Sequence, residues 1–288
     1  MSDCDRCSQS SCAGCPSASE KKVNPQDVAI HQFLGQVKHK FIVMSGKGGV
    51  GKSTVSVDLA LLLAEKGFKV GLLDVDLHGP SVAGMLGFSN AHLMAKKDRL
   101  LPFEVNKNLC FISAQGLLQS EDDPLIWRGP VKIGAIRQFL SDTDWPALDY
   151  LIIDCPPGTG DEPLTVVQTI PDAEAIIVTT PQKVSLADVR KSVNFCDMAH
   201  IKIRGIIENM SGFGWGAGVD SIAVQSSVQN FGEPNPINYK ALADEKQLPF
   251  LGQIPIDPMV VAAEDDGKPL QNLSEGCRKA LDDIVSKL

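Results

Sequence analysis

The segment 46–54, which reads Gly-Lys-Gly-Gly-Val-Gly-Lys-Ser-Thr, constrains this chain more than any other. It fits the pattern G-x-x-x-x-G-K-[ST], follows the apolar run 41–44 and opens a helical stretch that reaches residue 66. A glycine-rich loop between a strand and a helix lets backbone N–H groups and the helix N-terminus surround a phosphate. The residues that we expect to contact a bound nucleotide here are Gly46, Lys47, Gly48, Gly49, Val50, Gly51, Lys52, Ser53 and Thr54.

Two lysines and one hydroxyl of this loop have distinct expected roles. Lys52 is placed to reach the β- and γ-phosphates, and Ser53 is placed to bind Mg²⁺. Lys47 is a second cation, which an ordinary phosphate-binding loop does not need. It is either a solvated charge on a turn or a transition-state cation that is delivered to the nucleotide of a partner subunit.

Three aspartates stand where apolar runs end. Asp74 and Asp76 end the run 72–76, and Asp154 ends the run 151–154. Ligands of open α/β sheets bind at the carboxyl ends of the strands. We therefore expect Asp154 to hold Mg²⁺ directly or through water, Asp74 to support the water shell of the metal, and Asp76 to position the attacking water. A single aspartate at such a position is often only a helix cap, but three beside a phosphate loop indicate a metal and water site.

From residue 40 onwards, short apolar runs alternate with amphipathic stretches. This alternation predicts an α/β fold with the three layers of P-loop NTPases: a mostly parallel sheet with helices on both faces. The expected strands are Lys40–Ser45, Lys69–Asp74, Asn108–Ser113, Tyr150–Asp154, Ala175–Thr179, Ile203–Glu208 and Phe250–Gln253. The expected helices are Lys52–Lys66, Val131–Leu140, Leu186–Ala199, Tyr239–Lys246 and Leu273–Leu288.

Composition divides the chain into two parts. Residues 1–22 are rich in Ser and Cys and lack hydrophobic periodicity, which predicts a metal- or cluster-binding tail. Residues 23–288 are predicted to form the nucleotide-hydrolysing domain, introduced by a short helix between Val23 and Val37. Within it, residues 209–236 are rich in Gly, Ser, Gln and Asn, and predict an irregular excursion with a short helix near residues 221–228.

The overall charge and hydropathy bear on three properties: nucleic-acid binding, membrane association and localisation. A formal net charge of −8 disfavours nucleic acid as the main partner, because phosphate backbones require a basic face. No apolar run reaches the roughly 18 residues of a membrane span, and the polar N-terminus is unlike a secretory signal. We expect a cytoplasmic protein without stable membrane association.

Four of the eight cysteines gather at the start of the chain, as Cys4, Cys7, Cys12 and Cys15. In a reducing compartment, clustered thiolates bind metal more often than they form disulfides, and they select iron–sulfur clusters or zinc. Their tight spacing favours cluster ligation over a zinc knuckle, and a metal-free tail is the third alternative. The scattered cysteines, which we expect to be buried hydrophobic residues, are Cys110, Cys155, Cys196 and Cys277.

These motifs resemble those of the Mrp/ApbC iron–sulfur cluster carrier ATPases, a group with a deviant phosphate loop that includes the cytosolic Fe–S scaffold ATPases. The most specific matches are the tryptophan-containing segment 126–140 and the run Pro-Pro-Gly-Thr-Gly-Asp at 156–161. The resemblance implies slow Mg-ATP hydrolysis by a nucleotide-sandwich homodimer that carries a [4Fe–4S] cluster. It also implies that Lys47 acts across the dimer, that Asn209 recognises adenine and that Pro255 flanks the base. Apo iron–sulfur proteins or assembly factors would receive the cluster.

One departure from the family pattern leaves other functions open. The family follows Asn-Met-Ser-Gly-Phe with a Cys-x-x-Cys pair that holds a bridging cluster, but the corresponding positions here are Trp215 and Gly218. Either the N-terminal cysteines hold the one cluster, or the carrier role is lost. The alternative functions are a nucleotide-switched adaptor or positioning ATPase, and an ATP-driven redox protein.

Overall fold

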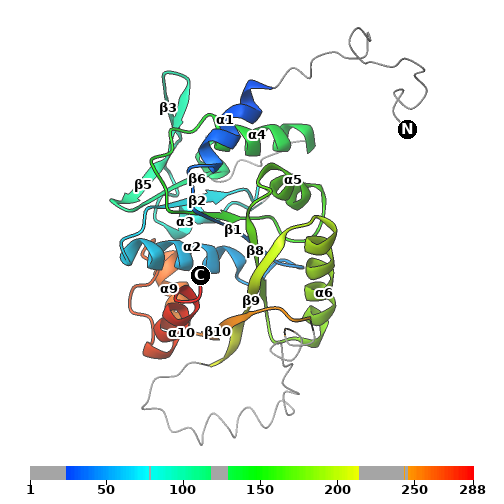
Figure 1. Ribbon diagram of the computed structural model, residues 1–288. Coiled ribbons are helices and arrows are strands. Elements are labelled where there is room, and N and C mark those ends of the chain that lie inside the picture. The colour runs from blue at the N-terminus through cyan, green and yellow to red at the C-terminus, as the bar shows by residue number, and fades with distance from the viewer. Residues whose placement is uncertain (1–23, 78, 118–128, 214–242, 244–245) are drawn as a thin grey trace, which may run out of the picture.

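An eight-stranded sheet forms the centre of the computed structural model, which describes residues 24–77, 79–117, 129–213, 243 and 246–288 (Figure 1). The strand order is β10-β9-β8-β1-β7-β2-β6-β5, and every neighbouring pair is parallel except β5 with β6. The strands are β1 (His39–Met44), β2 (Val70–Asp74), β5 (Phe103–Asn106), β6 (Leu109–Ser113), β7 (Tyr150–Asp154), β8 (Glu174–Thr179), β9 (Lys202–Phe213) and β10 (Phe250–Ile256).

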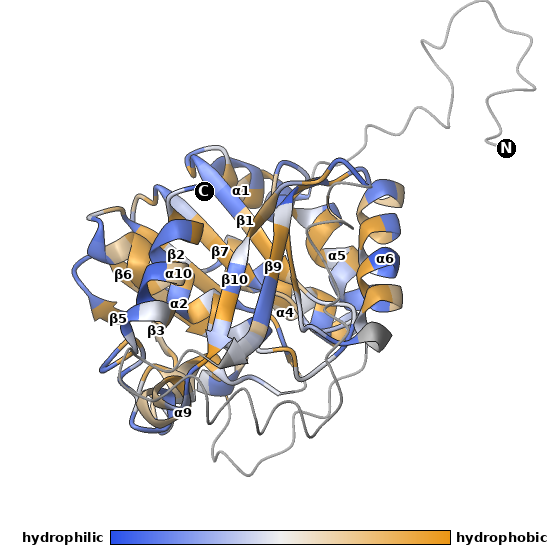
Figure 2. Ribbon diagram, turned by 90° about the horizontal axis from the view of Figure 1, so that it is seen from below, coloured by the Kyte–Doolittle hydropathy of each residue, from blue (hydrophilic) through white to orange (hydrophobic). Residues whose placement is uncertain are grey.

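Helices cover both faces of this sheet. One face packs on α1 (Pro25–Leu34), α4 (Gly129–Ser141), α5 (Asp161–Thr169) and α6 (Lys183–Met198). The other packs on α2 (Lys52–Glu65), the short α3 (Val82–Met85) and α10 (Glu275–Val285). Strand residues alternate between the two cores, since Ile42 and Met44 lie in the first and Phe41 and Val43 in the second. Hydrophobic stretches accordingly run through the strands in Figure 2, although β9 is partly hydrophilic. The predicted three-layer α/β fold is confirmed.

Several elements differ from the sequence prediction. The segment 209–213, predicted as the start of an irregular excursion, instead continues β9 to Phe213. The reason is tertiary, because Asn209 and Phe213 pair with Ile254 and Ile256 of β10. The excursion beyond residue 213, and most of the helix expected at 239–246, lie outside the described residues. Elements that the sequence reading missed are α3, α5, α9 (Pro258–Asp265), the edge strand β5, the turn of 3₁₀ helix at Ala114–Leu117, and the hairpin of β3 (Met94–Lys96) and β4 (Arg99–Leu101).

Two further expectations can be compared with the described residues. The four scattered cysteines are all buried and unpaired, as predicted. No helix in the described part of the chain is long and apolar enough to cross a membrane.

Helix α10 provides a test of the packing on the α2 face. Leu281 is fully buried where α10 packs on β10 and α2. Leu281→Ala removes all of its side chain beyond Cβ and leaves a cavity. We expect the free energy of unfolding, measured by urea denaturation, to fall by about 2–5 kcal/mol. The matched control is Met198→Ala at the end of α6, where the side chain is 83% exposed. A similar loss in both variants would contradict the packing described for α10.

Candidate functional site

The glycine-rich loop lies between β1 and α2, at the edge of the sheet where the parallel strands end. Val43 of β1 and Asp74 of β2 are both register partners of Asp154, which ends the central strand β7. The last residues of three neighbouring strands therefore border the loop. This is the edge at which open α/β sheets bind their ligands.

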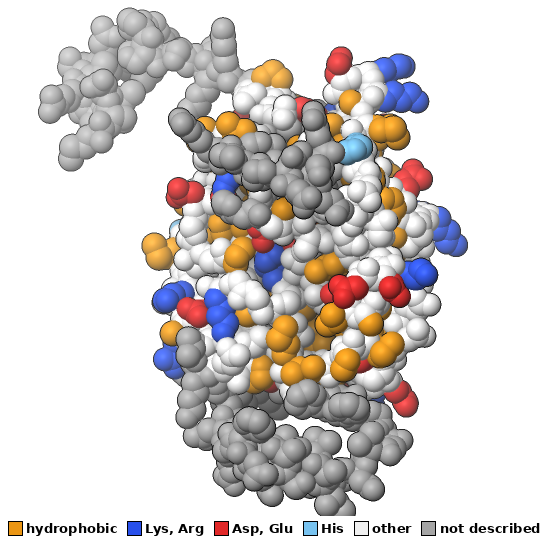
Figure 3. All heavy atoms as spheres, turned by 180° about the vertical axis from the view of Figure 1, so that it is seen from behind, with side chains coloured by type: hydrophobic (Ala, Val, Ile, Leu, Met, Phe, Trp, Pro, Cys, Tyr) orange, Lys and Arg blue, Asp and Glu red, His pale blue; other side chains and the backbone are white. Residues whose placement is uncertain are grey.

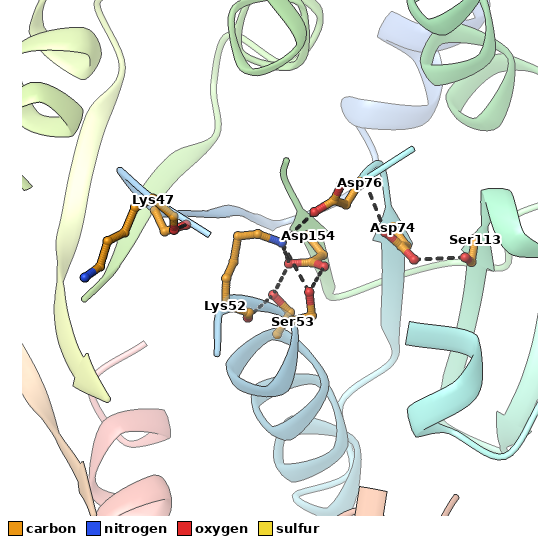
Figure 4. Close-up of polar contacts among 9 residues, drawn as sticks. Lys47, Lys52, Ser53, Asp74, Asp76, Ser113 and Asp154 are labelled. Carbon is orange, nitrogen blue, oxygen red and sulfur yellow. Dashed lines mark hydrogen bonds and ion pairs between the residues drawn. The ribbon is translucent and has the colours of Figure 1, made fainter. Parts of the chain in front are cut away.

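Lys52, Ser53 and Asp154 form the polar centre of the site (Figure 4). The Nζ atom of Lys52 donates to Oδ1 of Asp154 at 2.6 Å, and the Ser53 hydroxyl donates to Oδ2 at the same distance. The Ser56 hydroxyl also donates to Oδ1 of Asp154, at 3.0 Å. Asp154 is fully buried and Lys52 is 6% exposed. The carboxylate is thus stabilised by one cation and two hydroxyl groups from the first turns of α2.

Asp74 and Asp76 lie beside this centre but in different surroundings. Asp74 is fully buried, and its carboxyl group accepts hydrogen bonds from the Ser113 hydroxyl and the Asp76 N–H. Burial and the charge of Asp154 raise the pKa of Asp74 to about 8. The side chain of Asp76 is 13% exposed, with Oδ2 3.8 Å from the Lys52 Nζ. The three aspartates predicted to converge do lie together, and Asp76 is the one that reaches the cavity beside the loop.

The charge of Lys52 is set by the carboxylates around it. Burial alone would lower the pKa of Lys52, but Asp154, followed by Asp76 and Asp74, outweighs burial and raises it. Lys52 therefore stays cationic at neutral pH. A cation held in this position next to backbone N–H groups suits the β- and γ-phosphates of a nucleotide.

A cavity of about 210 Å³ lies over the loop. Its walls include Gly48, Gly49, Lys52, Asp76 and Pro157. Gly51 is required beside it, because its φ is +78° and a Cβ there would lie 2.2 Å from Nδ2 of Asn209. Gly46 is required for a different reason, since a Cβ would lie 2.4 Å from the backbone oxygen of Asp188 in α6.

The donor set fits Mg²⁺. The Ser53 hydroxyl and the Asp154 carboxylate are hard oxygen ligands held within hydrogen-bond distance of each other, and Asp74 is the next carboxyl group along the sheet edge. Ser53 and Asp154 would hold the ion, and a bound Mg²⁺ would neutralise charge on the phosphate oxygens. Within the described ranges, no group of three or more His, Cys, Asp or Glu residues is arranged to hold a metal ion, so the ligands here would be one carboxylate and one hydroxyl group.

Lys47 is in the loop but points away from this centre (Figure 4). Its Nζ donates to Oε1 of Gln182, the residue before α6, at 2.8 Å. It does not line the phosphate cavity. Both the expected contact of Lys47 with a bound nucleotide and its action on a partner's nucleotide stay predictions.

Asn209 and Pro255 line a second cavity, of about 120 Å³, that shares Gly51 and Thr54 with the first. Asn209 also braces the loop, because its Nδ2 donates to the Val50 oxygen and its Oδ1 accepts from the Met210 N–H, both at 2.9 Å. This bracing was not predicted from the sequence. An amide so engaged keeps one donor and one acceptor for a base.

Two contacts of the site also escaped the sequence reading. Ser56 lies four residues after Lys52, so helical spacing could have placed both on one face of α2. Gln182, however, is 135 residues from Lys47 and carries no local signal. The four N-terminal cysteines lie outside the described residues, so their ligand role stays a prediction.

Charged side chains are mixed on the face of the molecule shown in Figure 3, where acidic and basic groups lie side by side. A nucleic-acid-binding face is typically a continuous basic patch. The view is in keeping with the expectation that nucleic acid is not a partner, which stays a prediction.

Comparisons with known proteins show which family the chain belongs to. Residues 36–288 match the ParA family described as NUBPL iron-transfer P-loop NTPase. The iron–sulfur cluster carrier protein of Methanocaldococcus jannaschii is 44% identical, over 100% of this chain and 98% of that protein. The cytosolic Fe–S cluster assembly factor Nubp2 homolog of Aedes aegypti is 47% identical, over 88% of this chain and 94% of that protein.

Solved structures agree on the fold. A nucleotide-binding protein of Archaeoglobus fulgidus, in complex with ADP, has a TM-score of 0.68 and 35% identity, and covers 84% of this chain and 91% of its own. The septum site-determining protein MinD of Pyrococcus horikoshii, with a TM-score of 0.63 and 24% identity over 87% of this chain and 96% of its own, supports the fold alone. Fold and site define a P-loop nucleotide-binding protein. The chain belongs to the ParA-type family of iron-transfer P-loop NTPases, which confirms the resemblance noted from its motifs.

Lys52 provides the test of this site. We expect Lys52→Ala to abolish ATP binding in calorimetric titration, because it removes the cation for the phosphates. It also leaves the buried Asp154 without its charged partner, which should lower the free energy of unfolding by about 3–5 kcal/mol. The control Lys52→Ala/Asp154→Asn should recover much of that stability but no binding. Unchanged ATP affinity in Lys52→Ala would contradict the assignment.

Proposed function

We propose that this chain is an ATP-hydrolysing iron–sulfur cluster carrier that works as a homodimer. The observation that carries the proposal is the Lys52–Ser53–Asp154 centre in a chain that aligns over its whole length with a protein named as an iron–sulfur cluster carrier. The site supplies the nucleotide chemistry. The relatives, which are named as iron–sulfur cluster carriers and assembly factors, indicate the cargo.

Hydrolysis would be divided between two chains. Lys52 binds the β- and γ-phosphates, and Asp76, which faces the phosphate cavity, orients the attacking water. Lys47, directed away from its own phosphate cavity, is available to stabilise the charge that develops on the partner's nucleotide. Such an arrangement keeps hydrolysis slow until two chains meet, which suits a switch more than a metabolic enzyme.

The loop 155–160 would couple the presence of the γ-phosphate to the positions of the surrounding helices. It begins directly after Asp154, and the Gly158 N–H donates to the Ser45 oxygen at 2.8 Å, just before the phosphate loop. It ends at α5, whose Glu162 pairs with the buried Lys132 of α4 at 2.6 Å. A rearrangement beside the γ-phosphate therefore acts on α5 directly and on α4 through one ion pair.

The iron–sulfur cluster is the cargo in this proposal. Cys4, Cys7, Cys12 and Cys15 would bind it, as a [4Fe–4S] cluster that passes to apo iron–sulfur proteins or assembly factors. Because Trp215 and Gly218 stand at the family's Cys-x-x-Cys positions, we assign the cluster to the N-terminal cysteines alone. Zinc is the competing occupant of the same thiolates.

The division of labour between two chains can be tested by mixing variants. Lys47→Ala keeps its own nucleotide site but lacks the donated lysine, whereas Lys52→Ala lacks the site but still supplies Lys47. Each should be inactive alone, and a 1:1 mixture should recover about a quarter of the wild-type ATPase rate, because half of the symmetric dimers are mixed and each has one working site.

The matched control for this mixture is Asp76→Ala. Asp76 serves the nucleotide of its own chain, so mixing Asp76→Ala with Lys52→Ala should restore no phosphate release, although Asp76→Ala still binds ATP. Restoration by Asp76→Ala, or none by Lys47→Ala, would refute the assigned roles. Where Lys52→Ala folds poorly, Lys52→Ala/Asp154→Asn replaces it.

The cargo can be tested by anaerobic reconstitution of the full chain with iron and sulfide. We expect visible absorption and about four iron atoms per cluster in the wild type, and loss of both in Cys4→Ser/Cys7→Ser with ATP binding intact. Cys110→Ala, which changes a buried thiol of β6, should keep the cluster. A colourless protein that binds one zinc ion per chain would refute the cluster but not the ATPase.

A further inference from the structure

The smaller cavity beside the phosphate loop carries polar groups that the proposed mechanism does not use. It lies between α2, β10 and α9, and its apolar wall includes Val55, Ile254, Pro255 and Val260. Two carboxyl groups also face it, Asp58 from α2 and Glu264 from α9. Because this cavity shares Gly51 and Thr54 with the phosphate cavity, a nucleotide whose phosphates occupy the loop would place its base here.

Asp58 is buried, and none of the described residues donates a hydrogen bond to it. Its relative exposure is 3%, and its carboxyl group accepts no hydrogen bond from any residue that the structure describes. Burial, followed by the charge of Glu264, raises the pKa of Asp58 well above its ordinary value. Because Asp58 lines the cavity, a ligand bound there can supply the hydrogen-bond donor that no described residue provides.

Glu264 also lacks a hydrogen-bond partner among the described residues, but only at one of its two carboxyl oxygens. Its Oε2 accepts from the Thr54 hydroxyl at 3.2 Å, whereas its Oε1 is buried with no partner among the described residues. The cavity therefore combines carboxyl groups from α2 and α9 with an apolar wall. A flat, mainly apolar ring that bears N–H donors complements this surface.

Asn209, the amide expected to recognise the base, is partly engaged already. It braces the loop through Val50 and Met210 and retains one donor and one acceptor. Asp58 lines the same cavity, and no described residue uses its hydrogen-bonding capacity. The exocyclic amino group of adenine is a donor that a purine without that group lacks.

We propose that Asp58 accepts a hydrogen bond from the exocyclic amino group of adenine, and thereby makes the site select a 6-amino purine nucleotide. The proposal rests on the ATP site proposed above. Asp58 contacts the base and not the reacting phosphates, so it is a specificity-determining residue, with Glu264 providing the second acceptor at the same cavity.

The test compares two ligands that differ in one group. ATP and purine riboside triphosphate, which lacks the amino group, are titrated calorimetrically into the wild type, Asp58→Asn and Asp58→Leu. We expect the wild type to bind ATP about tenfold more tightly, as one satisfied buried hydrogen bond predicts. Asp58→Asn keeps an acceptor oxygen and should retain most of this preference. Asp58→Leu has a similar shape without an acceptor and should bind both ligands equally.

The outcomes separate this proposal from the proposed function. Equal affinity of the wild type for the two triphosphates would overturn the role of Asp58 while leaving the ATPase intact, and it requires no variant to fold. A preference that survives in Asp58→Leu, with both affinities lowered together, would show that Asp58 only supports the cavity wall, and also overturns the proposal. If the wild type binds neither triphosphate, the proposed function fails and the inference falls with it.

Discussion

The ion pair between Lys52 and Asp154 is the interaction on which the rest of the site depends. It joins the phosphate loop and α2 to β7, the strand at the centre of the nucleotide edge, and it is almost completely buried. Two hydroxyl groups of α2 complete the solvation of the carboxylate. A buried ion pair adds little to stability when both partners are present, but removing one leaves a charge without compensation. The pair therefore sets the position of the loop more than it stabilises the domain.

The three aspartates at this sheet edge differ in their charge partners, their pKa values and their exposure to solvent. Asp154 is paired with a cation, whereas Asp74 is buried beside Asp154, and its pKa rises to about 8. Asp76 is partly exposed and faces the cavity. Only Asp76 is placed to act on water that enters from solvent, and the other two hold their neighbours in position. All three residues carry the same functional group, so the difference follows from their surroundings: Asp154 has a cation beside it, Asp74 is equally buried without a direct cation partner among the described residues, and Asp76 is partly exposed.

Asn209 links the phosphate and base cavities. Its amide holds the Val50 oxygen of the loop, and Gly51 has no side chain because Asn209 occupies that space. Asn209 lies on β9 next to β10, and the same two strands bring Pro255 to the base cavity. One strand pair thus contributes to the loop conformation and to the wall of the smaller cavity, and its pairing extends β9 past the point where sequence composition suggested an irregular excursion.

The sequence by itself determined the phosphate loop, the seven parallel strands of the sheet, the three aspartates at strand ends and the buried cysteines. These features are local patterns, and short-range chemistry is enough to read them. The extension of β9, the contact of Lys47 with Gln182 and the lack of a described hydrogen-bond donor to Asp58 were decided by the tertiary structure alone. Each of them joins residues far apart in the chain, and whether a polar group is buried, paired or left facing a cavity depends on what the fold packs against it.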